Sequence, residues 1–107
     1  MGHSLIVDGN GALRGTGRNG SGQLGTGNYG YRNTFIQVLT NVNAVAVGQH
    51  HSLVIKSGLM GAGDGQYGQL GTYDNAVKNT FVQAFGIPSV SSIAAGVGSS
   101  LALDGVG

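Results

Sequence analysis

Histidine and aspartate are the side chains of this sequence with the greatest capacity for acid–base or metal chemistry. The three histidines are His3, His50 and His51, and the four acidic residues are Asp8, Asp64, Asp74 and Asp104. A metal site needs several ligands that converge on one point, and the sequence contains no cysteine to supply a thiolate. The spacing gives no such convergence and no paired carboxylates, so we expect neither a bound metal nor glycosidase-type chemistry.

Two histidine–serine pairs could be compared with a catalytic base and its nucleophile. Ser4 follows His3, and Ser52 follows His51, 48 residues later (51 − 3). Adjacent residues of a strand point to opposite faces, so neither serine lies beside its neighbouring histidine. Because the two histidines occupy equivalent places in a repeat, we predict that each makes a structural hydrogen bond between repeats. We predict no enzymatic activity.

The segment Gly15-Thr16-Gly17-Arg18-Asn19-Gly20 has the G-x-G-x-x-G spacing of dinucleotide-binding loops. Such a site requires a helix after the glycines, so that the phosphate meets the helix N-terminus. The residues that follow, Ser21-Gly22-Gln23-Leu24-Gly25, do not start a helix. We therefore interpret the segment as a turn and expect no cofactor. Asn19-Gly20-Ser21 is also a glycosylation sequon, which matters only in a secreted eukaryotic protein.

Two polar and aromatic loops are the candidate ligand-binding or partner-binding sites. They contain Tyr29, Tyr31 and Arg32 in the first loop and Tyr73, Asp74 and Lys78 in the second. Tyrosine, arginine and aspartate on neighbouring loops can bind protein or sugar surfaces. The alternative is that the tyrosines only cover the edges of the fold.

Composition and charge exclude several kinds of partner. The net charge of +1 gives no field that would attract nucleic acid or anionic lipid. No apolar run approaches the roughly 20 residues needed to span a membrane. No charged and then apolar segment marks a signal peptide, so we expect a cytoplasmic protein if the chain is expressed as given. Glycine supplies 22 of 107 residues without a Gly-X-Y period, and 40% hydrophobic residues can bury a core.

Internal repeats organise the chain. The segments His3-Ser4-Leu5-Ile6-Val7, His51-Ser52-Leu53-Val54-Ile55 and Ser99-Ser100-Leu101-Ala102-Leu103 begin at residues 3, 51 and 99, a spacing of 48. After 46 residues, Gly22-Gln23-Leu24-Gly25 recurs as Gly68-Gln69-Leu70-Gly71, and Asn33-Thr34-Phe35 recurs as Asn79-Thr80-Phe81. The difference in spacing falls in stretches rich in Gly, Pro and Asn, where loops tolerate length changes.

Each repeat contains four short apolar segments separated by Gly, Asn, Asp or Ser. Segments such as residues 4–7, 13–17, 34–38 and 42–47 are of strand length and rich in Val, Ile, Phe and Thr. None carries a helical stripe long enough to compete. Four strands in about 46–48 residues are typical of a β-propeller blade. We predict an all-β fold of about two four-stranded antiparallel blades.

These motifs resemble the repeats of the regulator of chromosome condensation family, and the resemblance covers essentially the whole chain. It rests on Val45-Ala46-Val47-Gly48, His51-Ser52-Leu53, Leu59-Met60-Gly61-Ala62-Gly63 and Gly68-Gln69-Leu70-Gly71, with a matching first repeat through His3-Ser4-Leu5 and Gly22-Gln23-Leu24-Gly25. The Asn-Thr-Phe segments resemble bacterial members most. The resemblance implies structural roles for His3, His51 and both Gly-Gln-Leu-Gly turns.

The sequence departs from the family pattern in two respects. Arg14 and Met60 stand where the family usually carries an aromatic ring, so the blades must be repacked there or are less tightly built. The family's full ring resembles seven blades, whereas this chain has about two.

Two blades would leave two broad apolar faces in water, which predicts self-association. With strands lettered A to D from the propeller axis outward, residues 1–41 supply B-C-D of one blade, 42–89 a complete A-B-C-D blade, and 90–107 the A and B strands of a neighbouring blade. We predict that strand exchange between chains closes a head-to-tail ring, of six blades in a trimer or eight in a tetramer. The B-type sequence occurs three times, at Leu5, Leu53 and Leu101, so two copies compete for one place or one adds at an edge.

The sequence therefore predicts a non-enzymatic, self-assembling propeller module with a scaffold or protein-interaction role. Its start inside a repeat, at Met1-Gly2-His3, favours an excised or engineered fragment with no natural ligand over a natural small gene product that assembles. A carbohydrate-binding propeller that uses the loop tyrosines is the alternative function. The family's nucleotide exchange on a small GTPase and its chromatin binding are not carried over, because no matched loop residues support them and the charge gives no basic face.

Overall fold

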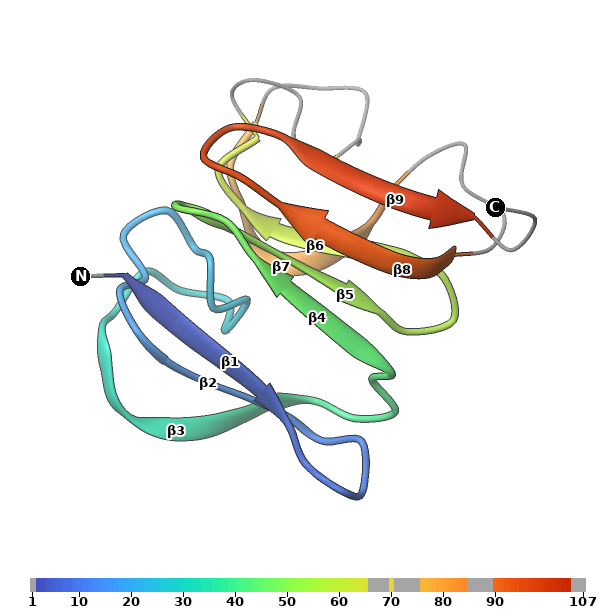
Figure 1. The fold of residues 1–107 in the computed structure, drawn as a ribbon. Helices are drawn as coiled ribbons and strands as arrows, with labels where there is room; N and C mark the ends of the chain where they lie inside the picture. Colours follow the sequence, from blue (N-terminus) through green and yellow to red (C-terminus); the bar gives the residue numbers. More distant parts are fainter. Residues whose placement is uncertain (1, 66–69, 71–75, 85–89, 105–107) are drawn as a thin grey trace.

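All of the regular structure in this computed structural model is β-strand, over the residues that it describes, 2–65, 70, 76–84 and 90–104 (Figure 1). The strands are β1 (His3–Val7), β2 (Leu13–Gly17), β3 (Arg32–Leu39), β4 (Ala44–Val47), β5 (His51–Ile55), β6 (Leu59–Gly63), β7 (Lys78–Gln83), β8 (Val90–Ala95) and β9 (Ser100–Asp104). The predicted all-β class is confirmed. Within the described ranges, no helix is long and apolar enough to cross a membrane.

The strands form three antiparallel sheets with the orders β1-β2-β3, β4-β5-β6-β7 and β8-β9. Strands that are consecutive in the chain pair with each other, so each sheet is a meander of the kind that forms propeller blades. The pairing register also repeats, because Leu5 faces Gly15 in the first sheet and Leu53 faces Gly61 in the second. The sequence repeat is therefore a repeat of sheet geometry.

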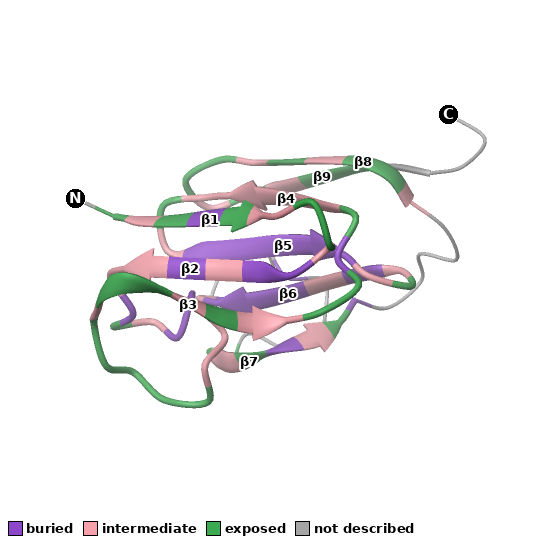
Figure 2. Cartoon of the chain, turned by 90° about the horizontal axis from the view of Figure 1, so that it is seen from below, coloured by how far each residue is buried: buried purple, intermediate pink, exposed green. Residues whose placement is uncertain are grey.

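The β4–β7 sheet lies between the other two sheets (Figure 1). The edge strand β4 of this central sheet contacts β1 on one side and β8 on the other. The next strand, β5, is buried at every residue, as the continuous purple band in Figure 2 shows. Because β5 has a sheet on both faces, its side chains do not alternate between buried and exposed.

Two apolar clusters fill the spaces between the sheets. The buried residues between the first two sheets are Leu5, Leu13, Leu24, Val42, Val54, Ala62 and Phe81. The second cluster comprises Leu53, Leu59, Leu70 and Ala84, and Ile93 and Ala95 of β8 pack against it. Leu53 and Val54 belong to different clusters because successive side chains of β5 point to opposite faces.

Asp8 shapes the turn between β1 and β2. Its Oδ1 accepts hydrogen bonds from the backbone N–H groups of Asn10 (2.9 Å) and Ala12 (3.1 Å). These bonds, and to a smaller extent the Arg14 guanidinium, hold the pKa of the Asp8 carboxyl below its usual value. Aspartate commonly forms such side-chain hydrogen bonds to the backbone two residues ahead, which favours a turn.

Arg14 and Met60, which stand where the similar repeats usually carry an aromatic ring, have different surroundings. Met60 faces Val54 across the β5–β6 pair and packs against the first apolar cluster, where it fills part of the space between two sheets. Arg14 occupies the same repeat position in β2, but its Nε lies 3.4 Å from Asp8 Oδ2. No sheet of the described residues covers this face of β2, so the arginine lies at a solvent-accessible surface.

Candidate functional site

A histidine, a serine and a backbone carbonyl join the first two sheets. His3 Nε2 lies 2.7 Å from Ser52 Oγ, and Ser52 Oγ donates a hydrogen bond of 2.6 Å to the carbonyl oxygen of Gln23. Ser52 has a single hydroxyl proton, so His3 must be the donor in its bond to Ser52. Ser52 and Gln23 are both buried, which makes this a satisfied polar link inside an apolar interface.

The same link recurs one repeat later. His51 Nε2 lies 3.1 Å from Ser100 Oγ, and both residues are 48 positions beyond their counterparts (51 − 3 and 100 − 52). His51 is fully buried, whereas Ser100 is only half-buried. The residue equivalent to Gln23 is Gln69, which lies outside the described residues. The hydrogen bonds between repeats that the sequence led us to expect for the two histidines are therefore present.

Both histidines are weak bases because they are buried. Burial lowers the pKa of His3 to about 4, although a hydrogen bond to the backbone of His51 acts in the opposite direction. Burial also lowers the pKa of His51, against a hydrogen bond to the Ser99 backbone and the negative charge of Asp64. The buried Nδ1 atom of each ring has no hydrogen-bond partner among the described residues.

The first Gly-Gln-Leu-Gly turn is wedged between the same two sheets. Gly22 and Gly25 have positive φ angles of 75° and 71°. A Cβ atom on Gly22 would lie 2.6 Å from the Cα atom of Asn79, and one on Gly25 would overlap the ring of Phe81. Glycine is thus required twice, for the backbone conformation and for the close approach of the second sheet.

The leucines of both Gly-Gln-Leu-Gly turns are core residues. Leu24 is 0% exposed in the first apolar cluster, and Leu70 is 1% exposed in the second. Gln23, next to Leu24, is 1% exposed, and its Oε1 accepts a hydrogen bond from the Ser21 N–H. The remaining predicted positions of the second turn, Gly68, Gln69 and Gly71, lie outside the described residues.

Asn19 organises the loop before β3 from inside the protein. Its fully buried side chain donates from Nδ2 to Thr26 Oγ1 (3.1 Å) and to the carbonyl oxygen of Asn28 (3.0 Å). Its Oδ1 accepts from the Leu24 N–H at 2.9 Å. The sequon at Asn19 is therefore inaccessible to glycosylation, and sequence reasoning missed the structural role of this residue.

The loop presents two of the predicted binding residues to solvent. Tyr29 is 50% exposed and Tyr31 is 69% exposed. Arg32 begins β3, and its Nη2 lies 3.5 Å from Asn28 Oδ1, while its carbonyl oxygen accepts a 2.8 Å hydrogen bond from Thr16 Oγ1. The loop therefore offers two aromatic rings on a backbone held by hydrogen bonds.

The structure brings this loop close to the start of β7. The Gly27 N–H donates a 2.7 Å hydrogen bond to the carbonyl oxygen of Asn79, next to Lys78. Lys78 occupies the repeat position of Arg32, since both residues open the fourth strand of their blade (78 − 46 = 32). Tyr73 and Asp74, the other predicted residues of the second loop, lie outside the described residues.

The G-x-G-x-x-G segment forms the end of β2 and the turn after it. No helix follows it in the part of the chain that the structure describes. Among the same residues, no group of three or more His, Cys, Asp or Glu side chains gathers in one place.

The outer face of the first sheet carries apolar side chains whose repeat counterparts are buried. Phe35 is 46% exposed, whereas its counterpart Phe81 is 8% exposed. Ile6 is 45% exposed, whereas its counterpart Val54 is 0% exposed. We call the surface formed by Ser4, Ile6 and Phe35 the N-terminal face. Sequence analysis predicted such a face without identifying its residues.

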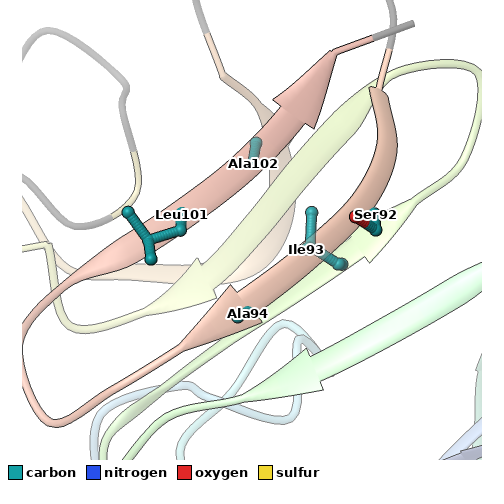
Figure 3. A pocket seen from close by; sticks show the side chains of 5 residues that line it. All are labelled: Ser92, Ile93, Ala94, Leu101 and Ala102. Carbon is teal, nitrogen blue, oxygen red and sulfur yellow. The ribbon is translucent and has the colours of Figure 1, made fainter. Parts of the chain in front are cut away.

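The outer face of the β8–β9 sheet shows the same contrast. Leu101 is 72% exposed, although its counterparts Leu53 and Leu5 are 1% and 9% exposed. Figure 3 shows the shallow hollow of this sheet, which is lined by Ser92, Ile93, Ala94, Leu101 and Ala102. We call the surface formed by Ala94 and Leu101 the C-terminal face. The two faces lie on opposite sides of the central sheet (Figure 1).

Comparison with sequences gives no assignment, since no family model and no curated protein matches the chain. Solved structures do match. The crystal structure of human WBSCR16 has a TM-score of 0.86 and 25% sequence identity, over 98% of this chain and 29% of that chain. Prp20p from Saccharomyces cerevisiae has a TM-score of 0.83 and 20% identity, over 97% of this chain and 29% of that chain.

A third match, in the crystal structure of Kap60 bound to yeast RCC1 (Prp20), has a TM-score of 0.78 and 24% identity, over 97% of this chain and 26% of that chain. The chain thus spans little more than a quarter of the length of these structures. Its three meander sheets follow the arrangement of their blades. The predicted propeller-blade fold is confirmed, and the chain has the fold of a segment of an RCC1-type β-propeller.

Proposed function

We propose that the chain is a non-enzymatic β-propeller module that associates with itself and serves as a scaffold for protein partners. The protein-interaction role is supported by the RCC1-type fold, because proteins of similar structure have protein partners: Prp20p binds Gsp1p and histones, and Kap60 is bound to yeast RCC1. A scaffold role also fits the histidines, since His3 and His51 are committed to hydrogen bonds between sheets and are withdrawn from solvent-accessible chemistry.

The observation that carries the self-association is the contrast between equivalent residues. Phe81 and Val54 are buried because another sheet lies on them, whereas Phe35 and Ile6 occupy the same places on an uncovered sheet. Leu101 shows the same contrast with Leu53 on the opposite side of the molecule. A second copy can cover the two faces with the packing that the chain already uses internally. Because the faces differ, the contact is head-to-tail and leads to a ring if it closes.

Native mass spectrometry at micromolar concentration tests this proposal. With about two blades per chain, we expect a trimer or a tetramer, which correspond to six or eight blades within the usual range for propellers. Substitution of Phe35→Asp should shift the distribution toward monomer, while Tyr31→Asp, at an exposed position outside the residues that define the two faces, serves as the control. A wild-type chain that stays monomeric throughout the concentration range contradicts the proposal.

A carbohydrate-binding function is the second candidate, and the exposure of Tyr29 and Tyr31 on an ordered loop favours it. Exposed aromatic rings on a fixed backbone can stack against sugar rings with little loss of conformational freedom. A glycan array probed with the wild type and with Tyr31→Ala separates the two functions. Glycan binding that is lost in the variant supports this candidate, and an array without any binding eliminates it.

A further inference from the structure

Strands β1 and β9 are two copies of the same repeat element in incomplete sheets. Ser100 and Leu101 of β9 correspond to Ser4 and Leu5 of β1, 96 residues earlier (100 − 4). In the complete central sheet the equivalent strand, β5, is paired on one side with β4 and on the other with β6. In contrast, within the described parts of the chain, β1 pairs only with β2, and β9 pairs only with β8.

The two incomplete sheets lack complementary parts. Among the strands that the structure describes, none takes the place in the β1-β2-β3 sheet that β4 has beside β5, and none takes the places of β6 and β7 in the β8–β9 sheet. A free inner edge on β1 is a template for another strand. A two-stranded sheet such as β8–β9 is marginally stable by itself. Together, β8 and the β1-β2-β3 sheet would make one blade with the strand order of the central sheet.

We propose that the β1-β2-β3 sheet of a second copy displaces β9 and pairs with β8, so that two chains build one complete blade. This inference rests on the self-association proposed above and specifies how it takes place. The sheet cannot come from the same chain, because β1-β2-β3 lies on the far side of the central sheet from β8 (Figure 1).

The exchange conserves the interactions that β9 makes and adds new ones. Ser4 of the second copy takes the place of Ser100 as the hydrogen-bond partner of His51, just as Ser52 is the partner of His3. Ile6 and Phe35 of that copy then cover the second apolar cluster, as Val54 and Phe81 cover the first. The N-terminal face therefore becomes buried, and the released β9 gives up little, because Leu101 is 72% exposed where it is.

The competition between β9 and β1 makes the exchange dependent on concentration. β9 is tethered to β8 by a tight turn, in which the Gly96 N–H donates a 3.0 Å hydrogen bond to the Ser99 carbonyl oxygen. A short tether gives β9 an effective concentration on the order of millimolar beside β8. The incoming β1-β2-β3 sheet can displace β9 only because it buries a larger surface than β9 does. We expect the tethered form in dilute solution and the exchanged form as the concentration rises.

Disulfide trapping tests the exchange directly, because the protein has no cysteine of its own. In the β8–β9 pair, Ala95 faces Ser100, and after exchange it faces Ser4 of the other copy. Facing Cα atoms of antiparallel strands are about 4.5–5.5 Å apart, a distance that a disulfide can span. One variant carries Ser4→Cys, the other carries Ala95→Cys, and the two are mixed in a thiol–disulfide redox buffer. We expect the mixed disulfide in several-fold excess over either homodimer, whereas statistical amounts of the three products overturn the inference.

A locked variant separates the exchange from self-association in general. Ala94→Cys and Leu101→Cys in one chain join two exposed, facing residues and fix β9 on β8. We expect this variant to remain monomeric when oxidised and to assemble like the wild type when reduced. An oxidised variant that still assembles overturns the exchange and leaves self-association standing. If the wild type and the reduced variant are both monomeric, the proposed function fails, and the exchange fails with it.

Discussion

Replacement of Ser52 by alanine removes the hydroxyl group at the centre of the link between the first two sheets. That hydroxyl donates to the Gln23 carbonyl oxygen at 2.6 Å and accepts from His3 Nε2 at 2.7 Å. Ser52 is 0% exposed and Gln23 is 1% exposed, so water does not readily replace the missing oxygen. Ser52→Ala therefore deprives the Gln23 carbonyl oxygen of this donor and His3 Nε2 of this acceptor inside the protein.

The loss of stability in Ser52→Ala follows from the number of polar groups that lose a hydrogen-bond partner. A buried polar group left without a hydrogen bond costs about 1–3 kcal/mol. His3 is only partly buried, so its N–H lies at the lower end of that range, and the Gln23 carbonyl carries the larger share. We expect Ser52→Ala to lower the free energy of unfolding by about 2–4 kcal/mol, a large fraction of the 5–15 kcal/mol typical of a whole domain.

The repeat supplies two matched controls. Ser100 has one hydrogen bond, to His51, at a half-buried position, so Ser100→Ala should cost about 0.5–1.5 kcal/mol. Ser4 is exposed, so Ser4→Ala should change stability by less than about 0.5 kcal/mol. Urea denaturation at pH 7 and one dilute protein concentration, followed by far-ultraviolet circular dichroism, gives the three values.

We expect the free energy of unfolding of Ser52→Ala to lie well below that of Ser100→Ala, and that of Ser4→Ala to lie close to the wild type. The interpretation is wrong if Ser52→Ala unfolds within about 0.5 kcal/mol of the wild type, because a satisfied buried link cannot be removed at so small a cost. It is equally wrong if Ser4→Ala is as damaging as Ser52→Ala, because the effect would then come from strand propensity and not from the hydrogen bonds.

Three further predictions concern the same interfaces. Burial lowers the pKa of His3 (to about 4) and of His51, so the unfolded chain binds more protons than the folded chain below pH 6.5, and the free energy of unfolding should fall as the pH drops from 6.5 toward 4. The contribution of His3 is about 1–2 kcal/mol once its partial exposure is allowed for. Equal free energies of unfolding from urea titrations at pH 7 and pH 5 would exclude this effect. Gly48→Ala should cost about 1–3 kcal/mol, because its Cβ atom would overlap the buried His51 ring, whereas Gly20→Ala, with nothing within 4 Å, should be nearly neutral in the same denaturation assay. Leu24→Ala should lower the free energy of unfolding by about 2–5 kcal/mol, since Leu24 is 0% exposed. An unchanged urea midpoint would contradict the assignment of Leu24 to the core.

The sequence was sufficient for the strands and their repetition because the features that define them are local. Glycine and asparagine mark the turns, and β-branched and aromatic residues mark the strands between them. The spacing of 48 between His3 and His51 placed the two rings in equivalent positions, and hydrogen bonds to Ser52 and Ser100 follow from that equivalence. Interactions that repeat with the sequence can be predicted from it.

Interactions that do not repeat could not be predicted in the same way. Asn19 has the sequence of a glycosylation site, but its burial depends on Thr26 and Asn28, which fold back over it. Nothing in the triplet Asn-Gly-Ser indicates whether the loop will enclose the side chain. The candidate binding loop is likewise held by a backbone hydrogen bond from Gly27 to Asn79, which lies in a different repeat.

Phe35 and Phe81 show most directly what the sequence of a repeat leaves undetermined. Both stand in the same Asn-Thr-Phe motif, as the fourth residue of β3 and of β7, yet one is 46% exposed and the other 8%. The difference comes from the neighbour, because the turn that ends at Gly25 of the first repeat packs on Phe81. In a repeat fold each unit is stabilised by its contacts with the next, so the environment of a residue depends on its place in the stack as well as on its motif. If chains join end to end as proposed, Phe35 acquires the surroundings of Phe81, and two identical motifs become equivalent in structure.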